Sequence, residues 1–226
     1  MRPPAWSFSG LNGFLTCPKQ YYHVKVIKDV KETKYEATLW GTLFHETAEI
    51  YLTTPTDLPP EFAQYRSYLD QFTGKPGVLR VEQELGIDRN LEPCAFDSPD
   101  VWCRGIVDVL NIADGIAMID DHKTGKRKPD SRQLKLFALL VFVNYPEVHT
   151  CHTTFQWVKT GEQDRAIFRR DQMMDMWNDF LPDLKKYAHA FKTETFIERP
   201  SGLCKNHCPV KQCQFCGVGE RKRPGY

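Results

Sequence analysis

The chain has 226 residues, of which 41% are hydrophobic and 26% are charged, a composition that excludes a wholly disordered protein. The 30 Lys and Arg residues nearly balance the 29 Asp and Glu residues, so the net charge of +1 excludes a uniformly basic coat for nucleic acid. No apolar run reaches the roughly 18 residues of a membrane span, and the first residues lack the pattern of an export signal. We therefore expect a cytoplasmic protein with no membrane partner.

The first third of the chain has the hydrophobic spacing of helices. Ser9 is expected to cap a helix that runs toward residue 22. A second helix is predicted over about 36–52, where apolar residues recur at helical spacing. Three prolines in residues 53–60 end that helix, and a shorter one is expected over about 61–72.

The pattern then changes to alternating and β-branched residues, which predict strands. The expected elements are strands over 78–87, 101–113 and 116–122, a helix over 131–144, a strand over 153–158, a long helix over 171–191 interrupted at Pro182, and an irregular tail from residue 199 onward. This order predicts an α/β fold in which helices flank a mixed sheet.

A predicted hairpin brings three charged side chains together. The dipeptide Asp114-Gly115 is typical of a two-residue turn, and such a turn fixes the register of the strands on either side of it. This register places Asp108 directly opposite Asp121 on one face of the sheet, with Lys123 two residues farther along that same face.

Two opposed carboxylates repel each other unless a cation lies between them, and Mg²⁺ or Mn²⁺ prefers oxygen ligands of this kind. A lysine beside the ion can orient a water molecule and stabilise negative charge on a phosphate. The three residues therefore suggest phosphodiester hydrolysis. The alternative is an ordinary ion pair between Asp121 and Lys123, with Asp108 on the surface.

Cysteines are concentrated near the end of the chain. Four of the eight lie within residues 204–216, and in a reducing compartment this clustering favours a metal or an iron–sulfur cluster over disulfides. The four thiols, Cys204, Cys208, Cys213 and Cys216, could by themselves bind Zn²⁺ tetrahedrally.

Several segments resemble the motifs of one nuclease family. Residues 105–108 and 119–126 are similar to the second and third motifs of the RecB-type branch of the PD-(D/E)XK nucleases, and residues 41–46 to its first motif. Gln133 with residues 136–138 resembles the glutamine helix of that branch, although Phe137 stands where the family usually has tyrosine.

The resemblance implies a restriction-endonuclease-like core and a role for each motif residue. His45, or Glu46 if the helix is rotated, would join Asp108 and Asp121 as a ligand of Mg²⁺ or Mn²⁺. Lys123 would activate the water, and Gln133 would position the lysine or the substrate. The basic residues that follow the hairpin are the expected phosphate contacts: Lys126, Arg127 and Lys128.

The cysteines also resemble the cysteine pattern of the iron–sulfur members of this branch. These members include the AddB nuclease domain and the CRISPR adaptation exonucleases. The resemblance implies a [4Fe–4S] cluster held by Cys17, Cys204, Cys208 and Cys213, with Cys216 as the alternate ligand. A single nuclease domain over 1–226 is expected, with a core over about 36–192 and a tail, 199–226, that packs with the segment around Cys17.

The resemblance thus implies a metal-dependent deoxyribonuclease, an exonuclease acting on DNA ends or single strands. A compact chain of this kind resembles the stand-alone nucleases of phages, in the cytosol of a bacterium or infected host. DNA is the expected partner, with a helicase, recombinase or single-strand-binding protein as further candidates. The alternatives are a non-catalytic DNA-binding or assembly subunit with the same fold, and an interaction protein that acts through a zinc-binding tail.

Overall fold

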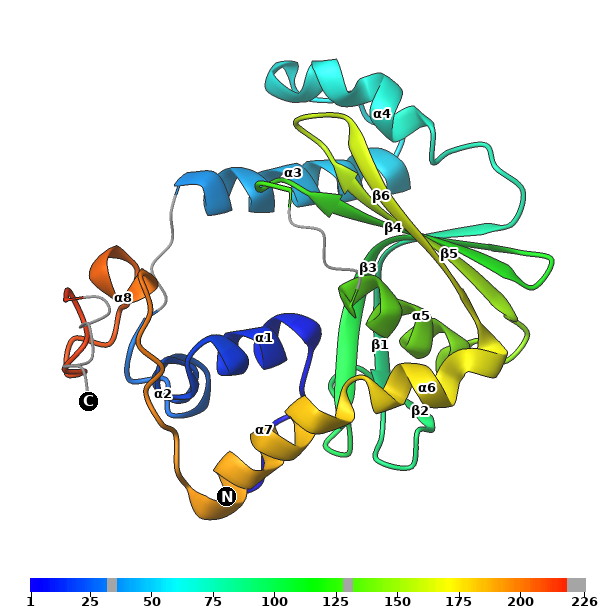
Figure 1. Cartoon of the computed structure of the whole chain (residues 1–226). Coiled ribbons are helices and arrows are strands. Elements are labelled where there is room, and N and C mark those ends of the chain that lie inside the picture. The colour runs from blue at the N-terminus through cyan, green and yellow to red at the C-terminus, as the bar shows by residue number, and fades with distance from the viewer. Residues whose placement is uncertain (32–35, 128–131, 219–226) are drawn as a thin grey trace. The chain divides into compact units, whose positions relative to one another are not determined.

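The computed structural model describes residues 1–31, 36–127 and 132–218. The chain forms two compact units, which are described separately here (Figure 1). One unit contains the central segment, Tyr35–Asp179, and the other contains both ends, Met1–Lys34 and Phe180–Tyr226.

The central unit is built on a six-stranded sheet with the order β2-β1-β3-β4-β5-β6. The strands are β1 (Val78–Ile87), β2 (Pro93–Cys94), β3 (Cys103–Ala113), β4 (Ile116–Lys123), β5 (Thr150–Trp157) and β6 (Glu162–Arg169). The β4–β5 pair is parallel and the other neighbouring pairs are antiparallel, so the predicted mixed sheet is confirmed.

The β3–β4 hairpin has the predicted register. Ala113 pairs with Ile116, and the ladder continues to Val109 and Asp120. Asp114 and Gly115 between the strands have φ values of 49° and 75°, the left-handed pair that a tight hairpin turn requires. The next position along the ladder belongs to Asp108 and Asp121.

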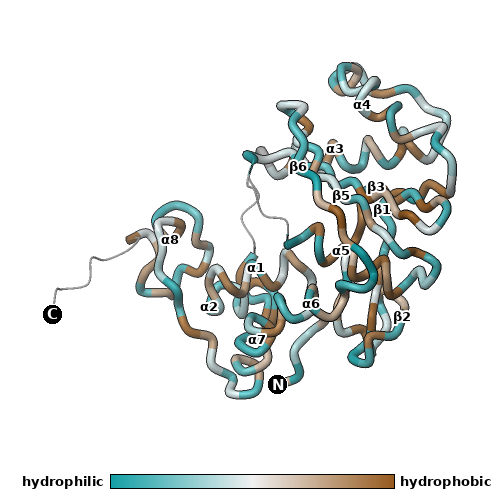
Figure 2. The backbone as a smooth tube through the Cα atoms, turned by 45° about the vertical axis from the view of Figure 1, so that its right-hand side comes forward, coloured by the Kyte–Doolittle hydropathy of each residue, from teal (hydrophilic) through white to brown (hydrophobic). Residues whose placement is uncertain are grey.

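Helix α5 (Arg132–Asn144) connects the parallel strands β4 and β5 and packs on the sheet. Its sequence is mostly hydrophobic, as the hydropathy colours of Figure 2 show along α5, and eight of its side chains are buried. The fit is close at Gly105, where an added Cβ atom would lie 2.8 Å from Leu140 Cδ1 and 3.2 Å from Phe137 Cε1. The glycine of the second motif thus lets the sheet and α5 approach each other.

A second layer contains α3 (Glu36–Thr53), the 3-10 helix Pro60–Tyr65 and α4 (Arg66–Asp70). Phe44, Phe62 and Phe72 from this layer form one buried cluster with Val109 of β3. The cluster anchors α3 beside the sheet and so fixes the position of His45, the residue after Phe44.

The expectations for residues 150–191 were partly wrong. Strand β5 begins at Thr150, and β6 was not predicted. The predicted long helix is three elements: a 3-10 turn (Arg170–Gln172), α6 (Met173–Asn178) and α7 (Leu181–Thr193). Pro182 lies in the first turn of α7, where its missing N–H needs no partner, so it begins a helix instead of bending one.

In the unit with the chain ends, α1 (Phe8–Thr16) is capped by Ser7, whose Oγ accepts the Gly10 N–H at 3.2 Å, and the predicted cap at Ser9 was wrong. Helix α2 (Pro18–Tyr21) and a π-helical turn (Tyr22–Val26) follow α1, and α8 (Leu203–Asn206) lies in the tail. No helix in the described ranges is both long and apolar enough to cross a membrane.

The core of this unit is aromatic. The Tyr21 and Tyr187 hydroxyls form a buried hydrogen bond of 2.9 Å, and Phe14 packs edge-on against both rings. This core holds the N-terminal helices against α7, although the central unit separates these helices from α7 in the sequence.

Candidate metal centre

Three adjacent strands bring one carboxylate each to the same level of the sheet. Glu82 and Asp108 occupy the position between the pairs Val81–Val109 and Gln83–Val107. The ladder is interrupted there, and Glu82 has φ 47°, a strained value for a residue within a strand. Such strain is typical of positions where the surrounding structure fixes a functional side chain.

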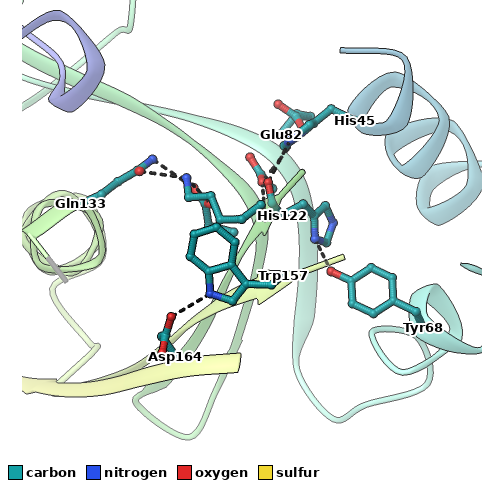
Figure 3. Close-up of polar contacts among 10 residues, drawn as sticks. His45, Tyr68, Glu82, His122, Gln133, Trp157 and Asp164 are labelled. Atoms are coloured by element: carbon teal, nitrogen blue, oxygen red, sulfur yellow. Dashed lines mark hydrogen bonds and ion pairs between the residues drawn. The ribbon is translucent and has the colours of Figure 1, made fainter. Parts of the chain in front are cut away.

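His45 of α3 completes this group. Its Nδ1 lies 3.6 Å from Glu82 Oε1 and 3.5 Å from Asp108 Oδ2 (Figure 3). The ligand atoms of the three residues all lie within 4.8 Å of one another, as binding of one ion requires. His45 Nε2 donates to the backbone carbonyl of His122 at 3.1 Å, which leaves Nδ1 for a metal. Histidine ligands of metals are commonly held in this way.

The electrostatics of the group are those of a cation site. Burial alone would lower the pKa of His45, but Glu82 and Asp108 raise it to about 9. Burial and the neighbouring charge of Asp121 raise the pKa of Asp108 well above its usual value. The carboxylates therefore concentrate negative charge where little water can solvate it. A proton on His45 neutralises part of this negative charge.

Asp121 belongs to an adjoining group with the lysine and the glutamine. Lys123 Nζ lies 2.5 Å from Asp121 Oδ2 and donates to Gln133 Oε1 at 2.9 Å. The Gln133 amide in turn donates to Asp121 Oδ1 at 3.0 Å. The structure thus brings all five predicted catalytic residues into one region, but it groups His45 and Asp108 with Glu82, and Asp121 with Lys123.

Sequence reasoning missed Glu82 and His122. Glu82 lies on a strand that is joined to β3 by residues 88–102, so no tight turn fixed its register beforehand. The alternation of polar and apolar residues in β1 was the only signal there, and it did not single out Glu82.

His122 lies between Asp121 and Lys123 and holds the site through its backbone and its ring. Its N–H donates to Asp108 Oδ2 at 2.7 Å, while its ring Nδ1 forms a 2.5 Å hydrogen bond with the hydroxyl of Tyr68. Burial lowers the pKa of His122 to about 3, so the ring is neutral near pH 7. It therefore adds no charge to the site.

A groove of about 600 Å³ opens at this centre. Residues 38–49 of α3 form one wall, and Thr124 and Gly125 form the other. The walls are close, because a Cβ atom on Gly41 would lie 2.7 Å from Thr124 Oγ1. The glycine of the first motif is therefore needed for the approach of α3 to the end of β4. Glu46 and Glu49 also line the groove, which makes it acidic.

The three predicted phosphate contacts differ in their surroundings. Lys126 is exposed to solvent. Arg127 is held by two carboxylates of β6: its Nε donates to Asp164 at 3.1 Å and its Nη1 to Glu162 at 2.9 Å. Lys128 lies outside the described residues.

Four of the eight cysteines line one small pocket in the unit that contains the chain ends: Cys17, Cys204, Cys208 and Cys213. The Cys17 sulfur accepts the Arg199 N–H at 3.5 Å. Cys216 does not line this pocket, and its thiol donates to the Cys208 carbonyl at 3.3 Å. Burial, and then the neighbouring thiols, raise the pKa of Cys208.

Two solved structures and one family model are similar to this chain. A putative exonuclease from Eubacterium rectale is similar in structure, with a TM-score of 0.50 and 14% identity over 98% of this chain and 91% of that one. SSO0001 is similar with a TM-score of 0.48 and 11% identity over 95% and 87% of the two chains. No curated protein matches the sequence. The family model of the PD-(D/E)XK nuclease superfamily matches residues 5–214, and the chain therefore belongs to that superfamily.

Proposed function

We propose that this nuclease is a deoxyribonuclease that depends on Mg²⁺ or Mn²⁺ and acts as an exonuclease on DNA ends or single strands. The observation that carries the proposal is the convergence of His45, Glu82 and Asp108 beside the Lys123–Asp121 pair. Membership of the nuclease superfamily and the likeness to a protein named an exonuclease support it.

The donor set suits a divalent cation. Glu82 and Asp108 offer carboxylate oxygens, and His45 offers Nδ1 with its ring orientation fixed by the His122 carbonyl. Asp121 is a further ligand in this proposal, since its carboxylate adjoins the group. When bound, the ion would polarise a phosphoryl oxygen and lower the pKa of a coordinated water molecule.

The protein's own contribution is to place a cation where charge develops. Lys123 is held by Asp121 and Gln133, so its ammonium group needs little reorganisation during the reaction. We assign it the orientation of the attacking water and the stabilisation of negative charge on the phosphate. Gln133 keeps both partners in place by donating to one and accepting from the other.

The acidic groove explains why a metal would be required. A nucleic acid that enters it meets Glu46, Glu49 and Glu82, which line the groove. Without a bound cation, these carboxylates would repel the phosphates. Lys126 at the mouth is the exposed basic residue best placed to contact DNA. A helicase, a recombinase or a single-strand-binding protein are the proposed protein partners.

We further propose that the pocket cysteines hold a [4Fe–4S] cluster that joins the two ends of the chain. Cys17, Cys204, Cys208 and Cys213 line one pocket and Cys216 does not, which supports the first four as the ligands.

A cleavage time course tests the catalytic proposal. DNA labelled at either end, single- and double-stranded, would be incubated with Mg²⁺ or Mn²⁺ and the parent, Lys123→Ala or Lys186→Ala. We expect the parent and the control Lys186→Ala, a change at an exposed lysine, to cleave DNA. The cleavage rate of Lys123→Ala should be at least about 100-fold lower, although all three proteins should bind DNA similarly. Binding without cleavage by the parent would overturn the proposal in favour of a non-catalytic subunit.

A further inference from the structure

A second cavity, of about 320 Å³, opens on the face of the sheet that carries Asp120, the residue before the predicted ligand Asp121. Side chains alternate along a strand, so Asp120 and Asp121 point to opposite faces. The strand register places Thr154 of β5 and Arg165 of β6 in the same row as Asp120. The segment that follows α4 forms the remaining wall of this cavity. These elements can be followed in Figure 1.

The floor of the cavity is a directed chain of hydrogen bonds. The Arg165 guanidinium donates to the side-chain oxygen Oε1 of Gln163, and the side-chain amide of Gln163 donates to Gln156 Oε1 at 2.9 Å. The Gln156 amide then donates to Asp120 Oδ1 at 2.7 Å. The neighbours of each glutamine side chain fix the orientation of its amide. The series of hydrogen bonds ends on the carboxylate of Asp120, which is only 6% exposed. The sheet thus presents a preorganised array of donors and acceptors to the cavity.

The rim of the cavity carries two cations, Lys75 and Arg165, which act on the Asp120 carboxyl of the floor: burial raises the pKa of Asp120, and their positive charges oppose this shift. Lys75 and Arg165 are exposed, and neither forms an ion pair with another residue of the described ranges. Lys75 instead lies 5.7 Å from the centre of the Phe72 ring. Arg127 differs, since Glu162 and Asp164 hold its guanidinium. Two exposed cations at one mouth, neither in an ion pair among the described residues, favour an anionic ligand such as a phosphate.

We propose that this cavity is a second nucleotide-binding site, in which the phosphate lies on Lys75 and Arg165 and the base lies over Met118. The choice of a nucleotide rests on the proposed function, because DNA and its products are the anions that a deoxyribonuclease meets. The cavity has the volume of a small-molecule site. Met118 is 37% exposed and provides an apolar surface for a base.

The floor favours a nucleotide over a bare phosphate. Amide and carboxylate side chains recognise the edges of bases, where glutamine pairs with adenine and aspartate accepts from the amino group of cytosine. Gln163 and Asp120 line the cavity, and the chain of hydrogen bonds in its floor leaves unused the second amide N–H of Gln163 and the second carboxylate oxygen of Asp120. A free mononucleotide and a nucleotide within a strand share this chemistry, so the experiment must distinguish them.

Methyl NMR of the full chain tests the site directly. Methionine would be labelled with ¹³C in its methyl group, and Met118→Leu would assign the Met118 signal. EDTA would keep the metal centre free of ions and prevent cleavage. The titrants are deoxyadenosine and deoxycytidine 5′-monophosphates, a short single-stranded oligonucleotide and inorganic phosphate. Because this titration needs neither metal nor cleavage, its failure is distinguishable from failure of the proposed function.

We expect the Met118 signal to shift saturably with a mononucleotide or the oligonucleotide, and whichever binds more tightly identifies the source. Lys75→Gln and Arg165→Gln should each weaken binding about fivefold or more, because each removes a charge-assisted contact to phosphate. Arg89→Gln makes the same change in charge at an exposed turn and should alter binding less than about twofold. An unmoved signal, an equal response to inorganic phosphate, or equal weakening by Arg89→Gln would overturn the proposal.

Discussion

The two candidate metal sites of this chain differ in what holds their ligands in place. At the carboxylate centre, Glu82, Asp108 and Asp121 lie on three adjacent strands, and the backbone of His122 bonds to both Asp108 and His45. At the cysteine pocket, Cys17 lies between two helices, and its partners follow in a tail with one four-residue helix among its described residues.

This difference predicts different consequences of metal loss. The sheet positions its carboxylates through the backbone pairs on either side of them, and His45 and Lys123 offset part of their repulsion, so the centre should stay folded without an ion. The described part of the cysteine tail has one short helix and no strand, so we expect the free energy of binding of the proposed cluster to be largely free energy of folding.

The largest effect is expected from Cys17→Ser. Loss of this ligand should release the iron and lower the free energy of unfolding of the unit that contains the chain ends by on the order of 5 kcal/mol. Iron analysis and thermal unfolding of the purified protein would measure both. Cys216→Ser is the matched control, and it should keep its iron.

Full metal content in Cys17→Ser together with loss in Cys216→Ser would reverse the assignment. The four-thiol zinc site of the tail would then replace the cluster that joins the chain ends.

At the carboxylate centre, Glu82→Gln should weaken divalent metal binding by about 100-fold, because it removes one charged ligand from a set held by backbone pairing. The protein should nevertheless unfold at nearly the parental temperature, unlike Cys17→Ser. Calorimetric titration with Mn²⁺ would measure the affinity. Glu84→Gln, an exposed change on the same strand, is the control. Equal affinities in the two variants would exclude Glu82 as a ligand.

How well each site can be predicted from the sequence depends on what holds its residues in place. The Asp108–Asp121 relationship could be predicted because a two-residue turn fixes the register of the strands that it joins. The position of Glu82 could not be predicted, because the connection from β1 to β3 is too long to fix the register of these two strands. Strand β6 was missed because its exposed residues are mostly polar, as expected of a strand at the edge of a sheet.

The local contacts of the site were equally invisible in the sequence. The pairing of Arg127 with β6 depends on a strand that was not predicted, so its sequence suggested only a basic loop. The choice of Ser7 over Ser9 as the cap of α1 depends on one hydrogen bond that either serine could have made. Fold class needs only the order of elements, whereas these details need the tertiary structure.

Metal affinity at the carboxylate centre should rise with pH. His45 has a pKa of about 9 in the folded, metal-free protein, so a metal must displace its proton over most of the range below that value. Affinity for Mg²⁺ should therefore increase by up to about tenfold per pH unit from 6.5 to 9 and then level off. Titrations in buffers of different ionisation heat would count the released protons. An affinity independent of pH would exclude His45 as a ligand.

Without metal, the same shift has the opposite consequence for stability. A raised pKa means that protonated His45 stabilises the fold fully below pH 6.5, and this contribution disappears as the pH rises through about 9. The metal-free protein should thus lose stability over the range in which metal binding strengthens. Thermal unfolding in EDTA would detect the decline.

The smallest effect is expected from Tyr68→Phe, which removes the hydroxyl bonded to the His122 ring. His122 Nε2 has no partner among the described residues, so the variant would leave a buried imidazole without its hydrogen bond. We expect a loss of about 1–2 kcal/mol in the free energy of unfolding. Metal affinity should fall less than about threefold, because the backbone of His122 still bonds to Asp108 and His45. Tyr65→Phe, in the same aromatic cluster, is the control. A loss of metal affinity in Tyr68→Phe as large as in Glu82→Gln would show that the ring of His122, and not the strand pairing, holds the centre together.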